Sequence, residues 1–303
     1  MGLWFIINSA SAKVAKKGAL LPQYAEQCSA SLRDVGDFSA IDNLAKEVLE
    51  SGARHVIIEG GDGTVHGVLT AFLKQSSGTK ALPDFTIIAG GNTNQVARNI
   101  GIAATPKALV KALSEKAERV HFPLLRIKDD KDQQAYGFLF STGALPQVTD
   151  YTTSKLHSKG LGGGAAVMGG ILKGLAGTGG ITEITPLELS VEAASPEQMS
   201  GPHLGTIVTT LPGLMLGLDP FWGSGALPLR VTYVAGNYKK LLRNTAGLWT
   251  RKTGKDRRAD GLHSWTASRL TYAYDGPCVL DGERLSLSPQ FTLTPTQPLG
   301  FLR

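Results

Sequence analysis

The first part of the chain has short apolar runs separated by amphipathic stretches, a pattern that predicts alternating strands and helices. Residues 3–7, 55–58 and 85–89 are apolar or β-branched runs typical of buried strands. Apolar residues in 41–49 recur at helical spacing, and Gly52 follows as a stop signal. Because strand, loop and helix repeat, we expect a parallel sheet with right-handed crossovers.

The pattern changes near residue 124, where short β-forming runs begin to alternate with frequent turn residues. These runs cover 124–127, 135–140, 187–191, 205–210, 229–234, 264–274, 278–280 and 291–293. Such spacing predicts a β-sandwich. We therefore expect a fold of class α/β + β. A Rossmann-like, parallel α/β nucleotide-binding domain occupies 1–124, and a C-terminal β-sandwich domain occupies 125–294. Residues 20–37 carry no clear pattern, and no element is predicted there.

The strand at 55–58 leads into a glycine-rich loop, Gly60-Gly61-Asp62-Gly63-Thr64, and apolar residues at helical spacing follow it. Glycines allow positive φ angles and close approach of a ligand. A helix start offers unpaired N–H groups and a positive dipole end, which favour phosphate. Asp62 is an acid where phosphate is expected, which suggests either a divalent cation between them or a bound hydroxyl. An ordinary glycine-rich turn is the alternative.

Two further loops follow predicted strands. The strand at 85–89 enters a second glycine loop that contains Gly91, Thr93 and Asn94, and the amide and hydroxyl groups there are suited to binding a nucleotide. The strand at 3–7 enters a loop with Asn8 and Ser11, which also suit a plain turn. Loops at the ends of parallel strands line one crevice in open α/β sheets.

Composition and charge narrow the function. The chain has 303 residues, 42% hydrophobic and 18% charged, so it is expected to fold. A net charge of +6 favours anionic partners such as nucleotides, nucleic acid or acidic lipid surfaces. The absence of nucleic-acid motifs and the low aromatic content argue against nucleic acid. Two widely spaced cysteines fit a reducing compartment. We expect neither a membrane-spanning helix nor a signal peptide.

A second acidic cluster, Asp281-Gly282-Glu283, lies about 220 positions after the pentad. Alone, Asp-Gly indicates a hairpin turn. Together with the pentad at 60–64, however, the chain resembles the diacylglycerol kinase catalytic-domain family. This family includes bacterial lipid kinases and sphingosine kinases, and it is related to NAD kinases and ATP-dependent phosphofructokinases. The residues that match the family elsewhere are Asn8, Ser11, Gly91, Asn94, Ala97 and Arg98.

The resemblance implies a cytoplasmic ATP-dependent lipid kinase that uses Mg²⁺, is peripheral at the inner membrane face and phosphorylates a lipid hydroxyl. The implied catalytic residues are Asp62, Glu283 and Asp281, with Glu283 as the base and with Asp62 and Asp281 as metal ligands. The implied nucleotide-binding residues are Asn8, Ser11, Gly60, Gly61, Gly63, Thr64, Gly91, Thr93 and Asn94. It also implies that residues 295–303 return to the first domain.

Some positions depart from the family or stay open. His66-Gly67 replaces a common Asn-Glu pair, and an acid is missing near Ser224, which puts metal contacts in doubt. A relative that binds nucleotide or lipid without phosphoryl transfer is therefore the alternative, and a kinase for a soluble acceptor such as NAD is a third hypothesis. The basic, Trp-bearing stretch 238–258 suits either an anionic membrane or solvent. The glycine-rich segment 160–180 is either a surface insertion or a mobile element beside a lipid entrance. The oligomeric state is not readable from the sequence.

Overall fold

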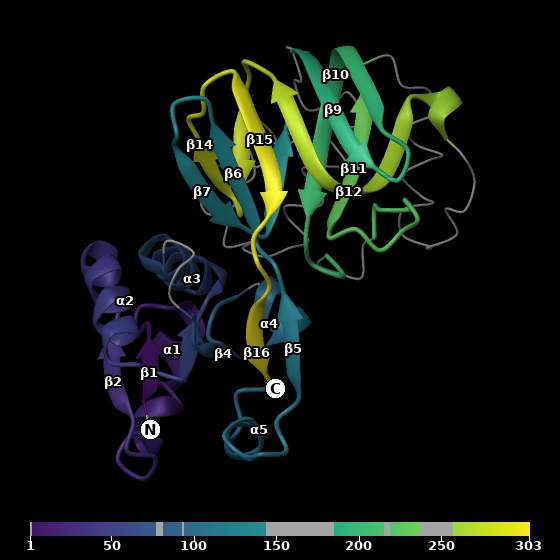
Figure 1. Cartoon of the computed structure of the whole chain (residues 1–303). Coiled ribbons are helices and arrows are strands. Elements are labelled where there is room, and N and C mark those ends of the chain that lie inside the picture. Colours follow the sequence, from purple (N-terminus) through teal and green to yellow (C-terminus); the bar gives the residue numbers. More distant parts are fainter. Residues whose placement is uncertain (1, 77–80, 93, 144–184, 215–218, 237–256) are drawn as a thin grey trace. The chain divides into compact units, whose positions relative to one another are not determined.

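The computed structural model describes residues 2–76, 81–92, 94–143, 185–214, 219–236 and 257–303 (Figure 1). Thr93, the segment 160–180 and most of the basic stretch 238–258 lie outside these residues. The chain forms two compact units, Met1–Pro123 with Gln297–Arg303, and Leu124–Thr296. We call them unit 1 and unit 2 and describe each by itself.

Unit 1 is built on a six-stranded sheet in the order β2-β1-β3-β4-β16-β5. The strands are β1 Leu3–Ile7, β2 Ser31–Asp34, β3 His55–Gly60, β4 Asp84–Ala89, β5 Arg119–Phe122 and β16 Leu299–Leu302. β2, β1, β3 and β4 pair in parallel, and β5 is antiparallel to β16. The expected parallel α/β sheet is confirmed. β2 was not predicted, because this edge strand carries no apolar run and most of its residues are exposed.

Helical segments cover both faces of this sheet. They are α1 Ala12–Lys17, η1 Leu21–Tyr24, η2 Phe38–Ala40, α2 Ile41–Glu50, α3 Asp62–Ser76, α4 Gln95–Ile100 and α5 Pro106–Ala112. On one face, Leu21 of η1 and Leu109 of α5 pack in a core cluster with Ile57. Neighbouring residues of a strand point to opposite faces. On the other face, Phe85 of β4 meets Phe72 of α3 edge to face, with ring centroids 5.3 Å apart.

The strand order places a topological switch point between β1 and β3. After β1 the chain passes through η1 to β2 on one side, and it later returns to place β3 on the other side of β1. Because η1 and α3 cover opposite faces, the connections that follow β1 and β3 diverge. In open α/β sheets, ligands bind at the carboxyl ends of strands at such a point.

β16 joins this sheet from the far end of the sequence. Its Phe301 is fully buried and lies 6.1 Å from the ring of Phe85 on β4. The Thr86 hydroxyl donates to the carbonyl of Leu302 at 2.7 Å, and the same hydroxyl lies 2.9 Å from His55 Nε2. Since that hydroxyl already donates to Leu302, His55 Nε2–H is the donor to it. Burial lowers the pKa of His55 to about 4, partly opposed by nearby Asp84.

Unit 2 contains a ten-stranded, connected sheet. Its strands are β6 Leu125–Asp129, β7 Gln134–Gly137, β8 Leu139–Thr142, β9 Pro186–Ala193, β10 Glu197–Thr209, β11 Leu229–Ala235, β12 Leu262–Ala273, β13 Cys278–Leu280, β14 Glu283–Leu285 and β15 Gln290–Pro295. A short helix, η5, covers Arg258–Asp260. The expected β-rich C-terminal domain is confirmed.

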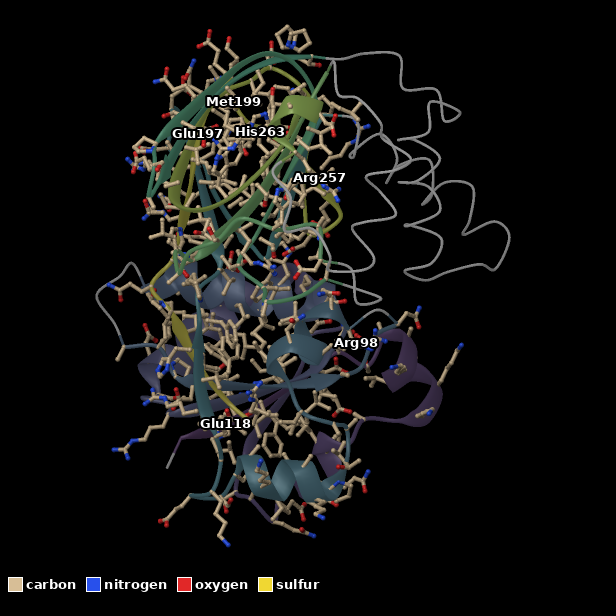
Figure 2. All side chains as sticks on the ribbon, turned by 90° about the vertical axis from the view of Figure 1, so that its right-hand side faces the viewer. Arg98, Glu118, Glu197, Met199, Arg257 and His263 are labelled. Atoms are coloured by element: carbon tan, nitrogen blue, oxygen red, sulfur yellow. The ribbon has the colours of Figure 1, made fainter. Side chains whose placement is uncertain are left out.

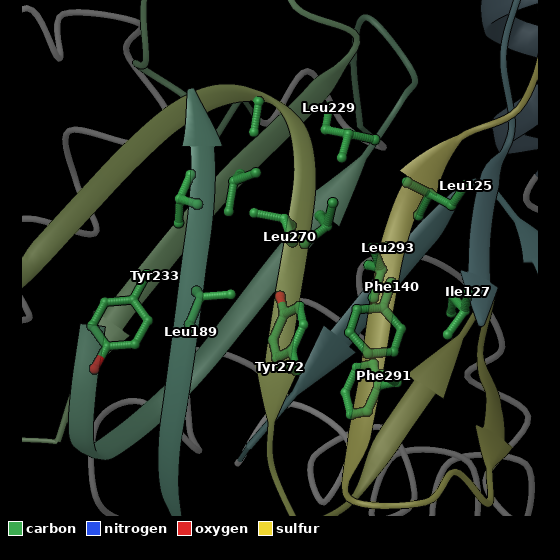
Figure 3. Close-up of a cluster of buried hydrophobic side chains, with 14 of the residues drawn as sticks. Leu125, Ile127, Phe140, Leu189, Leu229, Tyr233, Leu270, Tyr272, Phe291 and Leu293 are labelled. Atoms are coloured by element: carbon green, nitrogen blue, oxygen red, sulfur yellow. The ribbon is translucent and has the colours of Figure 1, made fainter. Parts of the chain in front are cut away.

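The sheet of unit 2 folds over a shared core (Figure 3). Phe140 of β8 contacts Tyr272 of β12 and Phe291 of β15, with ring centroids 5.9 Å apart in both pairs, although neither strand pairs with β8. Two long strands make this closure possible. The first half of β10 pairs with β9 and its second half with β11. The first half of β12 pairs with β11 and its second half with β15. The result is the face-to-face packing expected of a sandwich.

In one place a predicted strand is divided. Residues 135–140 form the end of β7 and the start of β8, with a break at Phe138. The N–H groups of Phe138 and Leu139 leave the ladder there and donate to the carboxylate of Asp281. Sequence periodicity does not report this distant partner. Within the described ranges of both units, no helix is long and apolar enough to cross a bilayer.

Candidate functional site

Three loops meet at one edge of the sheet in unit 1. They follow β1, β3 and β4, and because these strands are parallel and adjacent, their carboxyl ends lie side by side. The loops begin with Asn8, Gly61 and Gly90. The backbone N–H of Asn8 donates to the carbonyl of Glu59 at 3.0 Å, and that of Gly90 donates to the carbonyl of Gly60 at 2.7 Å. Most of the sequence-predicted nucleotide-binding residues are therefore brought together.

Side chains connect the first loop to the pentad. Asn8 Nδ2 donates to the hydroxyl of Thr64 at 2.9 Å, and Ser11 Oγ lies 3.3 Å from the same hydroxyl. Ser11 Oγ also accepts from the N–H of Gly61 at 3.2 Å. Asn8 and Thr64 are both buried, so these polar groups satisfy one another inside the protein. The match at Asn8 and Ser11 was weak in the sequence, yet both residues belong to this cluster.

Gly90 and Gly91, in the loop after β4, pack closely against the backbone of Gly60 and Gly61. A Cβ added at Gly91 would lie 2.6 Å from Gly61 Cα, and one at Gly90 would lie 2.9 Å from Gly60 Cα. None of these four glycines has a positive φ angle. The positive φ angles that glycine permits are not used at these positions, and the absence of side chains instead allows contact between the two loops. Gly63 differs, since an added Cβ there meets no heavy atom within 4 Å.

Asp62 holds the second glycine loop in place. Its two carboxylate oxygens accept from the N–H groups of Gln95 at 2.9 Å and Val96 at 3.0 Å, at the start of α4. An acid at a helix start satisfies unpaired N–H groups and complements the dipole. The N–H of Lys13, in α1, donates to the carbonyl of Gly90 at 2.9 Å. This bond links the second glycine loop, after β4, to the segment that follows β1.

Asn94 is engaged within its own loop. Its Oδ1 accepts from the N–H of Gly91 at 2.8 Å, and its Nδ2 donates to the carbonyl of Gly91 at 2.7 Å. The residue is buried and has left-handed backbone angles, which asparagine tolerates better than most residues. Its amide therefore shapes the loop, and its expected contact with a nucleotide stays a prediction.

Sequence reasoning missed Glu59, the last residue before the pentad. Its carboxylate is buried and accepts from the N–H of Leu20 at 2.8 and 2.9 Å and from that of Leu21 at 2.9 Å. It thereby anchors the start of η1 to the end of β3. The available signal was an acid inside an otherwise apolar strand, since a buried charge requires partners.

The departures from the family pattern have structural explanations. Gly67 in α3 packs against Phe38, where an added Cβ would lie 2.7 Å from the ring. His66 is half-buried in the same helix rather than placed in a loop.

Arg98, which matches the family pattern, lies on α4 (Figure 2). It is exposed there and forms no ion pair within the described part of the chain.

The second acidic cluster forms a hairpin turn in unit 2. Asp281 and Gly282 connect β13 and β14, and both have positive φ angles, 51° and 93°. The Asp281 carboxylate accepts from the N–H groups of Phe138 and Leu139 at 2.8 to 3.1 Å. Two positive φ angles are the signature of a type I′ turn, for which Asp-Gly is favoured. Asp281 thus fastens the turn to the neighbouring strand.

Glu283 is the first residue after this turn. It is exposed, and its carboxylate has no hydrogen-bond or ion-pair partner among the residues that the structure describes. Asp219 is an acid of unit 2 a few positions before Ser224, and its carboxylate is paired with Arg230 at 2.5 Å. Of the three acids Asp219, Asp281 and Glu283, only Glu283 has a carboxylate without a partner in the described residues.

The described residues do not form a metal cage. No three His, Cys, Asp or Glu side chains gather in the part of the chain with described coordinates. Asp62 and Asp281 each use their carboxylates to hold backbone N–H groups. The two acids belong to different units, as do Asp62 and Glu283. The role of Asp62 and Asp281 as metal ligands stays a prediction. The resemblance also implies that Asp62 and Glu283 converge on one site, and this too stays a prediction.

Comparison with known proteins gives matches of two kinds. Residues 2–123 match the family model described as the diacylglycerol kinase catalytic domain. A protein named "Probable lipid kinase YegS-like" from Chromohalobacter salexigens is 32% identical over 180 residues, 56% of this chain and 52% of that protein. A protein of the same name from Stenotrophomonas maltophilia is 35% identical over 132 residues, 44% of this chain and 42% of that protein. The aligned region spans about half the length of these relatives.

Solved structures resemble the whole fold. A putative diacylglycerol kinase from Bacillus anthracis has a TM-score of 0.66 at 15% identity, covering 99% of this chain and 95% of that one. A second protein from that organism, described as a diacylglycerol kinase, has a TM-score of 0.62 at 13% identity, covering 99% and 96%. At such identities the likeness concerns the fold alone. With the family model that matches residues 2–123, the expected resemblance to the diacylglycerol kinase catalytic domain family is confirmed.

Proposed function

We propose that this protein is a lipid kinase that transfers the γ-phosphoryl group of ATP to a lipid hydroxyl. The observation that carries the proposal is the meeting of three loops at the carboxyl ends of β1, β3 and β4, within the region that matches the family model. The names of the two aligned relatives support a lipid as the acceptor. The acceptor's identity is left to experiment.

The phosphates of ATP would lie at the start of α3. Gly63 faces open space there, so its backbone can approach a ligand. The N–H groups of the first helical turn have no partner within the helix and attract phosphate oxygens. Most N–H groups of the first loop are already used, since Ser9, Ala10 and Ser11 donate to Asp34 or Asn8. In this proposal Asn8, Ser11 and Thr64 mainly hold the loops in shape.

Glu283 is the proposed base. As the bond between the γ-phosphorus and the bridging oxygen of ATP breaks, the lipid hydroxyl oxygen forms the new bond to phosphorus. The hydroxyl proton passes to the Glu283 carboxylate, and ADP leaves. An exposed carboxylate without a partner is available for that proton, whereas the carboxylate of Asp281 already accepts from two backbone N–H groups.

A divalent cation bound with the nucleotide would neutralise part of the negative charge of the phosphates. Because the described side chains form no cage, such an ion would be held chiefly by phosphate oxygens and water, as Mg²⁺ commonly is. Asp62 would lie near it while still holding the start of α4.

Labelled ATP, offered with diacylglycerol, monoacylglycerol, sphingoid bases and NAD in separate reactions, tests the proposal. We expect a labelled lipid, and Glu283→Gln should remove most of it while ATP binding persists. The second candidate is a relative that binds nucleotide without transfer, which the structural uses of Asp62 and Asp281 favour. ATP binding without any labelled product would support that candidate and reject the kinase.

A further inference from the structure

The helix α5 of unit 1 presents two contrasting faces. Leu109 and Ala112 are buried, and Leu109 packs in the core cluster with Ile57 and Ile88. Thr105 caps the helix by accepting from the N–H of Ala108 at 3.3 Å. This face is fixed to the sheet, so the orientation of the opposite face is determined as well.

The opposite face combines positive charge with an exposed apolar residue. Lys107, Val110 and Lys111 follow the spacing i, i+3 and i+4, which places them on one side of α5, and Ser114 follows just after the end of the helix. Val110 is 61% exposed, more than any other large hydrophobic residue in the described ranges. These side chains, with Glu115 and Lys116, line an open depression of about 530 Å³. We call this the α5 surface.

The lysines of the α5 surface form no salt bridge within the described residues, although Lys111 also attracts the carboxylate of Glu118 electrostatically. Neighbouring cations do form salt bridges, because Arg119 pairs with Asp84 at 2.7 Å and Arg303 pairs with Glu118 at 3.1 Å. Glu115 is the one acid that lines the depression, and the Glu118 carboxylate already accepts from Arg303. The depression therefore keeps an excess of positive charge.

Only part of this charge serves the helix itself, because Lys111 in the last turn complements the helix dipole whereas Lys107 does not. Lys107 lies in the first turn, where the helix dipole disfavours a cation, and this turn contains no acidic residue. Val110 likewise leaves most of its apolar surface exposed. A cation in the first turn and an exposed apolar residue do not stabilise the helix, and binding of a partner is the other physical reason for such residues.

We propose that the α5 surface docks onto an anionic lipid bilayer. Lysines on one side of a helix are attracted to acidic headgroups, and an apolar residue at their centre enters the boundary between headgroups and acyl chains. Charge complementarity identifies the partner as anionic, and exposed Val110 favours a bilayer over an acidic protein or nucleic acid. No residue of the α5 surface belongs to the basic stretch 238–258. Docking requires no phosphoryl transfer, so it stands apart from the proposed function.

Sedimentation with vesicles tests the proposal without ATP. The full chain should bind vesicles of phosphatidylcholine and phosphatidylglycerol in equal parts, and it should bind pure phosphatidylcholine much more weakly. The triple variant Lys107→Gln, Lys111→Gln, Lys116→Gln should lower partitioning by about two orders of magnitude, roughly fivefold for each lysine. The matched control, Lys16→Gln, Lys46→Gln, Lys74→Gln, loses the same charge from other helices of unit 1 and should change partitioning much less.

Val110→Trp provides a second readout. We expect the added indole fluorescence, taken as the difference from the unsubstituted chain, to shift to shorter wavelength with anionic vesicles and not with inorganic phosphate. Three results would overturn the proposal: equal loss of binding in the triple variant and its control, no shift for Val110→Trp, or a shift produced by phosphate alone. Equal loss would indicate attraction by net charge, and the phosphate result would indicate a small-anion site.

Discussion

The two acidic motifs of this chain use their carboxylates differently. At the loop edge of unit 1, Asp62 joins its neighbours in a network that holds three loops together. In the hairpin of unit 2, Asp281 fastens the turn, and Glu283 beside it stays exposed without a partner in the described ranges. The comparison teaches that motif residues of unit 1 mainly shape backbone, while the hairpin offers a side chain still available for chemistry.

Replacing each acid of the hairpin by its amide should give the largest effect and sharpen this comparison. We expect Glu283→Gln to lower turnover by about 10²- to 10⁴-fold if Glu283 is the base, with the free energy of unfolding unchanged within about 0.5 kcal/mol. Initial-rate assays and urea unfolding measure the two quantities. Asp281→Asn is the matched variant, and it should lower stability because one acceptor oxygen becomes an amide donor facing an N–H. Full turnover in Glu283→Gln would contradict the assignment.

Acid should destabilise unit 1 through His55. Because the pKa of His55 falls from about 6.5 in the unfolded chain to about 4 in the folded one, the unfolded chain binds the extra proton first. The stability is complete above pH 6.5 and is lost as the pH falls towards 4. The loss is at most about 3 kcal/mol, from about 2.5 pKa units. Urea unfolding at several pH values, with His55→Gln as the reference, should show a shallower pH slope in the variant.

Gly91→Ala and Gly63→Ala separate packing from ligand approach within unit 1. A Cβ at Gly91 meets backbone at 2.6 Å, so we expect a loss of about 2 kcal/mol in the free energy of unfolding. A Cβ at Gly63 meets only open space, and this variant should keep its stability within about 0.5 kcal/mol. If ATP phosphates approach Gly63, the variant should still lose ATP affinity by calorimetry. Unchanged affinity would place the phosphates elsewhere.

Glu59→Gln tests the acid that the sequence did not reveal. One oxygen is replaced by an amide donor facing the N–H groups of Leu20 and Leu21, so we expect a loss of about 1–2 kcal/mol. Glu50→Gln is the control, since its exposed pair with Lys46 is worth little. An equal loss of unfolding free energy in both variants would show that buried Glu59 stabilises the protein no more than exposed Glu50 does.

The sequence predicted what local pattern controls. β1 and the strand cores of β3 and β4 follow from apolar runs, and the glycine loops follow from composition. β2 escaped prediction because an exposed edge strand needs no apolar run. Asp62 and Asp281 were recognised as important, but their bonds to Gln95 and Phe138 depend on partners 33 and 143 positions away. Spacing along a chain does not encode such contacts.

The position of β16 has a consequence for synthesis. Its residues, 299–302, complete the sheet of unit 1 between β4 and β5, yet they are translated only after all of unit 2. A nascent chain with residues 1–123 already outside the ribosome therefore keeps a gap beside Phe85, where Phe301 will later be buried. Until that strand arrives, the unpaired edges on both sides of the gap are exposed to wrong partners, so this unit has particular reason to engage a chaperone during translation.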